Sequence, residues 1–134
     1  MKLMERCPMT TPLALLDRNH LMAMTGGDKA LALEVIDIFR EQAAIWSRLM
    51  DPHADPKQWA DAAHTLKGSS LSIGALQLAQ VCERAEKAGR ADVPPGKTAA
   101  AVLLGDVRDA LAHTLEEAAK AAYELAGKGA LRAS

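Results

Sequence analysis

Apolar residues recur at three- and four-residue spacing through most of the chain, and five segments show this pattern of an amphipathic helix. The first segment, roughly residues 13–24, is short and ends at Gly26 and Gly27. A long second helix is expected to begin after Asp28, a good N-cap residue, and to end at the sequence DPHADP. Its predicted apolar stripe consists of Leu31, Val35, Ile38, Phe39, Ile45 and Leu49.

Turn-forming residues mark the bounds of the other three helices. We expect helices over residues 57–73 and 75–88, joined tightly at Gly74, and a final long helix from Thr98 to about Leu125. The sequence GRADVPPGK indicates a loop before the final helix, and the tail GKGALRAS is expected to be loose. The apolar stripe of the final helix is predicted to contain Leu103, Val107, Leu111, Leu115, Ala118, Ala122 and Leu125.

Short connections between the long helices predict an all-α fold, an antiparallel up-and-down four-helix bundle with a short additional N-terminal helix. The scarcity of aromatic residues and the abundance of Ala and Leu also favour helices over strands. With 134 residues, we expect a single domain over residues 1–134, with the bundle at approximately 13–126 and loose ends.

Net charge, apolar runs and cysteine spacing indicate which partners and which location to expect. The formal net charge of -1 argues against a nucleic-acid partner. The sequence has no signal-peptide pattern and lacks the roughly 18 uninterrupted apolar residues of a membrane span. Cys7 and Cys82 lie far apart without metal-ligand spacing, so both are interpreted as reduced thiols. We therefore expect a cytoplasmic monomer without a membrane partner.

The stretch AHTLKGSSLSIGA, residues 63–75, carries the candidate chemistry. At about 100° per residue, His64 points away from the predicted inner face of its helix, with Lys67 and Gly68 beside it. An outward imidazole can attack an electrophile, the Lys67 ammonium can stabilise a transferred phosphoryl group, and Gly68 leaves room for the attack. The predicted inner face consists of Trp59, Ala62, Ala63, Leu66, Ser70 and Ile73.

The neighbours of His64 suggest further roles. Ser69 and Ser70 are expected to pack against a neighbouring helix. Ala60, Asp61 and Leu71 are predicted on the outer face, where the apolar residues could form a docking patch with Leu21 or Met22. Spacing alone leaves open a second interpretation, in which His64 is an ordinary surface residue with Lys67 and Gly68 as chance neighbours.

HTLKGSSLSIGA followed by VCERAEKAGR resembles the signature of histidine-containing phosphotransfer (HPt) domains, especially stand-alone phosphotransmitters of multistep phosphorelays. The DIFREQ segment at residues 37–42 belongs to the same resemblance. It implies that His64 accepts a phosphoryl group from a phospho-aspartate of one receiver domain and passes it to another. The implied partners are response regulator receiver domains and a hybrid sensor histidine kinase.

The resemblance implies a carrier and not an enzyme with an ATP site. The sequence has no Gly-rich nucleotide-binding loop, so His64 is not expected to be phosphorylated from ATP by this chain. No cofactor is expected, and Mg²⁺ is expected only in the partner receiver domain.

Glu86 departs from several relatives, which carry glutamine at this position. Its carboxylate would repel a phosphoryl group, yet it could accept the Nδ1 proton of a free imidazole and leave the other nitrogen available for attack. Alternatively, Glu86 pairs with Arg90, four residues later in the same helix.

Two other classes of function remain as alternatives. A metal site would use Asp61 and His64, but the candidates for its second half, Asp109, His113 and Glu116, do not repeat their spacing. A helical docking protein would instead bind and inhibit a kinase or receiver without carrying phosphate, through the same surface.

Overall fold

The computed structural model describes residues 13–127, and all regular secondary structure in that range is helical. The expected loose ends, apart from Gly127, and the expected reduced thiol of Cys7 lie outside these residues. The helices are α2 (Arg18–Met24), α3 (Lys29–Leu49), α4 (Pro56–Ile73), α5 (Leu76–Gly89) and α6 (Lys97–Leu125).

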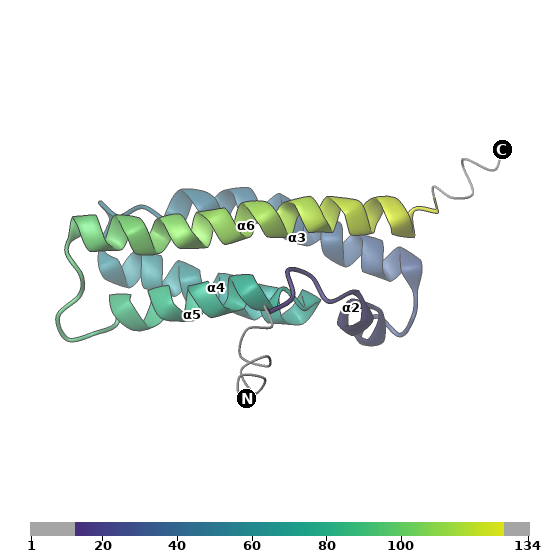
Figure 1. Ribbon diagram of the computed structural model, residues 1–134, viewed down its shortest axis with the longest axis horizontal. Coiled ribbons are helices and arrows are strands. Elements are labelled where there is room, and N and C mark those ends of the chain that lie inside the picture. The colour runs from purple at the N-terminus through teal and green to yellow at the C-terminus, as the bar shows by residue number, and fades with distance from the viewer. Residues whose placement is uncertain (1–12, 128–134) are drawn as a thin grey trace, which may run out of the picture.

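The four long helices lie side by side along the molecule (Figure 1). α3 and α5 each pack against both α4 and α6, so the four helices enclose one core. The short helix α2 packs on α4 and α3 at the end of the molecule where α6 ends. An ion pair between Arg18 Nε and Glu124 Oε1, 3.0 Å apart, also joins α2 to α6.

The first helix begins at Arg18 and not near residue 13, because the preceding segment binds the turn between α4 and α5. The backbone N–H of Asp17 donates to the Gly74 carbonyl at 3.0 Å, and that of Gln77 donates to the Ala14 carbonyl at 3.1 Å. Asp17 then caps α2 by accepting a hydrogen bond from the His20 backbone N–H.

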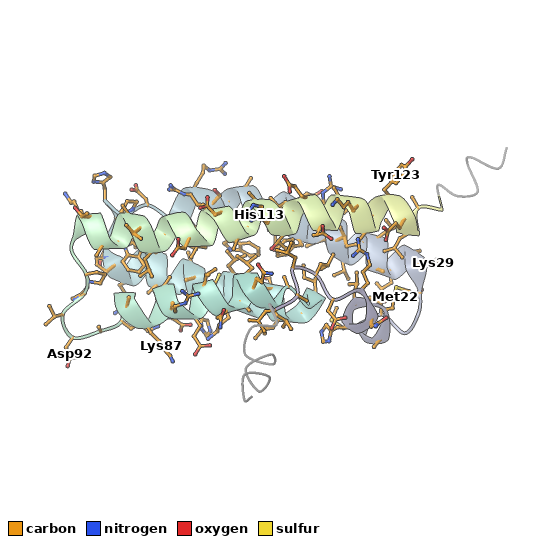
Figure 2. The ribbon with its side chains drawn as sticks, viewed as in Figure 1. Met22, Lys29, Lys87, Asp92, His113 and Tyr123 are labelled. Atoms are coloured by element: carbon orange, nitrogen blue, oxygen red, sulfur yellow. The ribbon has the colours of Figure 1, made fainter. Side chains whose placement is uncertain are left out.

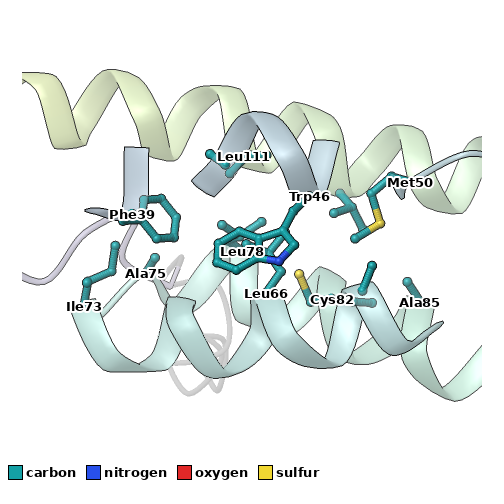
Figure 3. Packing of buried hydrophobic residues seen from close by; sticks show 14 of the residues in the cluster. Phe39, Trp46, Met50, Leu66, Ile73, Ala75, Leu78, Cys82, Ala85 and Leu111 are labelled. Carbon is teal, nitrogen blue, oxygen red and sulfur yellow. The ribbon is translucent and has the colours of Figure 1, made fainter. Parts of the chain in front are cut away.

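The core is built from apolar side chains of all five helices (Figure 3). Trp46 of α3 lies near Leu66 of α4 and near Leu78 and Cys82 of α5, whereas Phe39 of α3 lies nearer to Ile73 and Ala75. Burial raises the pKa of the Cys82 thiol to about 12, so the thiol stays protonated at neutral pH. Cys82 is a free thiol, as expected.

The apolar stripe that was predicted to face the core from α3 was largely wrong. Of its six positions only Phe39 is fully buried, whereas Ile38 and Ile45 are 53% and 50% exposed. A second stripe, about 100° around the helix, faces the core, because its two alanines allow close helix packing beside its two aromatic rings. The buried side chains of α3 and its C-cap are Ala32, Ile36, Phe39, Ala43, Trp46 and Met50.

The predicted stripe of α6 is closer to the observed one. Val107, Leu111 and Ala118 are buried, and the other predicted members pack partly buried against the core. The centre of the buried face is rotated slightly, and its further members are Ala100, Leu104, Thr114 and Ala121.

At Gly89, α5 packs closely against α4. A Cβ atom at this position would lie 2.7 Å from Ala60 Cβ and 2.8 Å from the Pro56 carbonyl oxygen. Gly89 was predicted to begin a loop, but it is the last residue of α5, where only the absence of a side chain allows this packing. Among residues 13–127, no helix is long and apolar enough to cross a membrane.

Candidate functional site

The outward orientation predicted for His64 is confirmed. Its side chain is 62% exposed, whereas all six residues of the predicted inner face of α4 are buried. Asp55 caps the start of the helix by accepting from the Lys57 backbone N–H, and Gly74 ends it in a left-handed conformation with φ 80°. A well-capped helix with one buried face therefore presents His64 to solvent.

The packing role expected of the two serines is observed for Ser70. Its side chain is fully buried, and its Oγ donates a 2.7 Å hydrogen bond to the Leu66 carbonyl one turn earlier. Ser69 is half-buried and lines a groove between α3 and α4.

Glu86 of α5 contacts the imidazole. His64 Nδ1 lies 2.9 Å from Glu86 Oε2, and Arg90 Nε donates to the same oxygen at 3.2 Å. Lys67 Nζ forms an ion pair with the other carboxylate oxygen, Oε1, at 3.0 Å. The two sequence hypotheses for Glu86 are thus compatible, since the carboxylate binds both the imidazole and Arg90.

Glu86 is ionised in this setting. Burial alone would raise the pKa of its carboxyl group, but hydrogen bonds from Lys67, Arg90 and His64 outweigh burial and lower the pKa from 4.5 to about 2. An ionised carboxylate only accepts hydrogen bonds, so Nδ1 of His64 must carry the proton. In the neutral imidazole, the other ring nitrogen, Nε2, then holds a free lone pair.

Arg90 links the two helices of the site. Its guanidinium also pairs with Asp61 of α4, with Nη1 3.0 Å from Oδ1. The hydrogen bond to Glu86, and then that to Asp61, raise the pKa of Arg90 above its ordinary value. Arg90 therefore stays charged and holds the Glu86 carboxylate beside His64.

Lys67 and Gly68 flank His64 as predicted. The Lys67 side chain is 25% exposed and is paired with Glu86 in this structure. Around Gly68, a Cβ atom would meet no other atom within 4 Å. The space beside the imidazole is therefore open to a reaction partner.

The predicted docking residues are only partly brought together. Asp61 and Leu71 are exposed, but Ala60 is fully buried because Gly89 brings α5 against that side of α4. Leu21 is also buried in the core, whereas Met22 of α2 is half-buried (Figure 2).

The exposed apolar side of α3 was not predicted, because its residues were assigned to the core. Ile38 lines a groove with Ser69 and Ser72 of α4, and Leu49 lines a second groove with Asp61 and Thr65. The signal was the regular spacing of these side chains along α3. Leu31, Ile38, Ile45 and Leu49 are each at least 42% exposed.

Among the residues that the structure describes, none completes the alternative metal site at Asp61 and His64. Within residues 13–127, no group of three or more His, Cys, Asp or Glu side chains is placed to hold a metal ion. His113 lies on α6, whereas Asp61 and His64 lie on α4 and contact Arg90 and Glu86 (Figure 2).

Comparisons with known proteins agree with this geometry. The profile of the family described as Hpt domain matches residues 30–121. The crystal structure of histidine phosphotransferase ShpA from Caulobacter crescentus is similar, with 35% sequence identity and a TM-score of 0.68. The similarity covers 87% of this chain and 98% of that chain. Comparison with curated proteins gave no match. The sequence resemblance is thus confirmed, and the chain belongs to the Hpt domain family.

Proposed function

We propose that His64 is the residue that carries the phosphoryl group in this phosphorelay intermediate. The observation that supports this most directly is the exposed imidazole whose Nδ1 is held by Glu86, which leaves Nε2 as the nitrogen that can react in the neutral ring. Nε2 would attack the phosphorus of a receiver phospho-aspartate, forming a P–N bond as the P–O bond breaks. Transfer to a second receiver would reverse these steps at another aspartate.

Lys67 and Gly68 are proposed to assist this transfer. The Lys67 ammonium lies one turn from His64 and could move from Glu86 to the phosphoryl oxygens, where negative charge gathers during transfer. The open space at Gly68 would admit the aspartyl phosphate of the receiver.

Receiver domains are proposed to dock on the surface formed by α3 and α4 beside His64. The docking surface consists of Ile38, Leu49, Asp61 and Leu71, all of which are exposed. It replaces the predicted patch that included the buried Ala60. An apolar strip next to a polar reactive group fits a partner that must exclude water around the transferred phosphoryl group.

The direction of the helices and the lack of a cofactor are further parts of this proposal. Short connections after α3, α4 and α5 support the expected antiparallel, up-and-down order of the long helices. We further propose that the chain acts without its own nucleotide or metal cofactor, and that Mg²⁺ for the reaction is bound by the receiver domain.

The test is incubation with a phosphorylated receiver, followed by measurement of label on this chain. The parent should acquire acid-labile, alkali-stable label, and His64→Ala should acquire none while keeping its helical circular dichroism. Label that persists in His64→Ala, on His20, His53 or His113, would contradict the assignment. A parent that binds the receiver without acquiring label would instead support the alternative function as an inhibitory docking protein.

A further inference from the structure

The contact between Glu86 and His64 involves the ring nitrogen that does not receive the phosphoryl group. Glu86 Oε2 lies 2.9 Å from Nδ1, and the carboxylate is only 14% exposed. Because this oxygen is an acceptor, the Nδ1 proton is held in a hydrogen bond that does not need to break when Nε2 reacts.

The fate of this proton decides how easily the phosphoryl group leaves. When Nε2 of the neutral ring forms the P–N bond, the donor aspartate leaves with the P–O electron pair, and the Nδ1 proton stays on a phosphoimidazolium. In onward transfer, an acceptor carboxylate attacks the phosphorus, and the P–N electron pair returns to Nε2 of a neutral imidazole. If Nδ1 had lost its proton, the leaving group would be an imidazolide anion, which is far less stable.

We propose that Glu86 is a positioning residue that retains the Nδ1 proton while His64 carries the phosphoryl group, and thereby keeps the group ready for onward transfer. The carboxylate stabilises the positive charge of the ring, so the transferable form persists at pH values where an unassisted phosphohistidine would lose the proton. This inference rests on the proposed role of His64 as the phosphoryl carrier.

The charges around Glu86 are consistent with this role. Lys67 and Arg90 oppose a positive charge on the ring, but both contact the Glu86 carboxylate. The carboxylate itself contacts Nδ1 directly, and Asp61 partly offsets Arg90. The same two cations also offset the repulsion between Glu86 and the incoming phosphoryl group.

Other ionisable groups of α5 near Glu86 add little net charge. Glu83 and Lys87 form an ion pair with each other, at 3.1 Å, and the Lys87 side chain extends away from the bundle (Figure 2). The thiol of Cys82 is buried and protonated.

The test is the pH dependence of onward transfer in Glu86→Gln, a variant that keeps an acceptor oxygen but removes the charge. Phosphorylated parent and variant are mixed with unphosphorylated receiver, and the rate of phosphoryl loss is measured from about pH 6 to about pH 9. The same samples are titrated by ³¹P NMR, which reports the protonation of the phosphorylated ring directly.

We expect the rate of Glu86→Gln to fall at lower pH than that of the parent. For each pH unit by which the midpoint moves down, the rate above both midpoints should fall about tenfold. The ³¹P midpoint should move in the same direction. If Glu86→Gln acted only by releasing Lys67 from its ion pair, phosphoryl transfer would instead be slower at every pH, and the midpoint would not change.

The control is Glu83→Gln, which removes the same charge one turn away in α5, from a residue that pairs with Lys87. It should keep the parent profile. Equal midpoints in Glu86→Gln and the parent would overturn the inference while leaving His64 as the carrier. Failure of the parent to acquire label on His64 would overturn the proposed function as well, so the two failures are distinguishable.

Discussion

Glu86 contacts His64 and Lys67 only through the packing of α5 against α4. His64, Lys67 and Gly68 lie within five residues of one helix, so helical geometry alone predicted that they share a face. Whether Glu86 reaches His64 depends on the register between α4 and α5, which the spacing within either helix does not encode. The sequence therefore left two hypotheses for Glu86, and the structure accommodates both.

The low pKa of Glu86 predicts a particular acid dependence of stability. Its folded-state pKa is about 2 against an ordinary value of 4.5, so the stabilisation is complete above pH 4.5 and is lost as the pH falls toward 2. Glu86→Gln lacks this contribution. The free energies of unfolding of parent and variant, from urea titrations, should therefore differ near neutral pH and converge near pH 2. A constant difference across this range would contradict the assigned ion pairs.

At the scale of elements, Gly89 sets the approach of α5 to α4. The close packing of Gly89 on Ala60 and Pro56 brings Glu86, in the last turn of α5, and the C-cap residue Arg90 beside α4. Gly89 was predicted to begin a loop, because a glycine near proline residues is typical of a turn. A packing role for glycine becomes visible only when the neighbouring helix is in place.

The two helical glycines near the site should respond to alanine in opposite directions. Gly68→Ala should raise the free energy of unfolding by up to about 1 kcal/mol, since the new methyl group meets no other atom and alanine favours the helix. Gly89→Ala should lower it by about 1–3 kcal/mol, because the methyl group would overlap Ala60. Urea unfolding of both variants tests this. A stabilising Gly89→Ala would show that α4 and α5 separate readily.

α3 illustrates why apolar spacing did not identify the buried side of a helix. Two apolar stripes lie about 100° apart on α3, and both satisfy helical periodicity. The stripe with the larger number of aliphatic side chains was assigned to the core, but the stripe with alanines and aromatic rings packs inside. The choice depends on the fit of side-chain volumes between helices, which periodicity does not describe.

At the scale of the whole molecule, two grooves join the exposed side of α3 to α4. The groove lined by Leu49 also contains Asp61 and Thr65, which neighbours His64 in α4. The family and the helical fold could be predicted from the sequence, because the local signature around His64 and the helical spacing are both encoded over short distances. The proposed docking surface could not, since it combines residues from two helices.

Two substitutions on this surface separate docking from phosphoryl chemistry. Ile38→Lys and Leu49→Lys place a charge on exposed α3 positions, so the free energy of unfolding should change by less than about 0.5 kcal/mol. Each should lower transfer from subsaturating phosphorylated receiver by about tenfold, because a lysine in an apolar contact must lose its hydration. Phosphorylation of His64 by phosphoramidate, a donor too small to need docking, should keep its parent rate.

Val102→Lys is the matched control for these variants. Val102 is 65% exposed on α6, a helix outside the proposed docking surface, and its substitution adds the same charge. Because the added charge is the same, any long-range effect on an acidic or basic receiver should appear in all three variants and should weaken with salt. A loss of transfer confined to Ile38→Lys and Leu49→Lys would place the receiver on α3 and α4. Equal transfer by all three variants would show that the receiver reaches His64 without covering α3, from the side of α5.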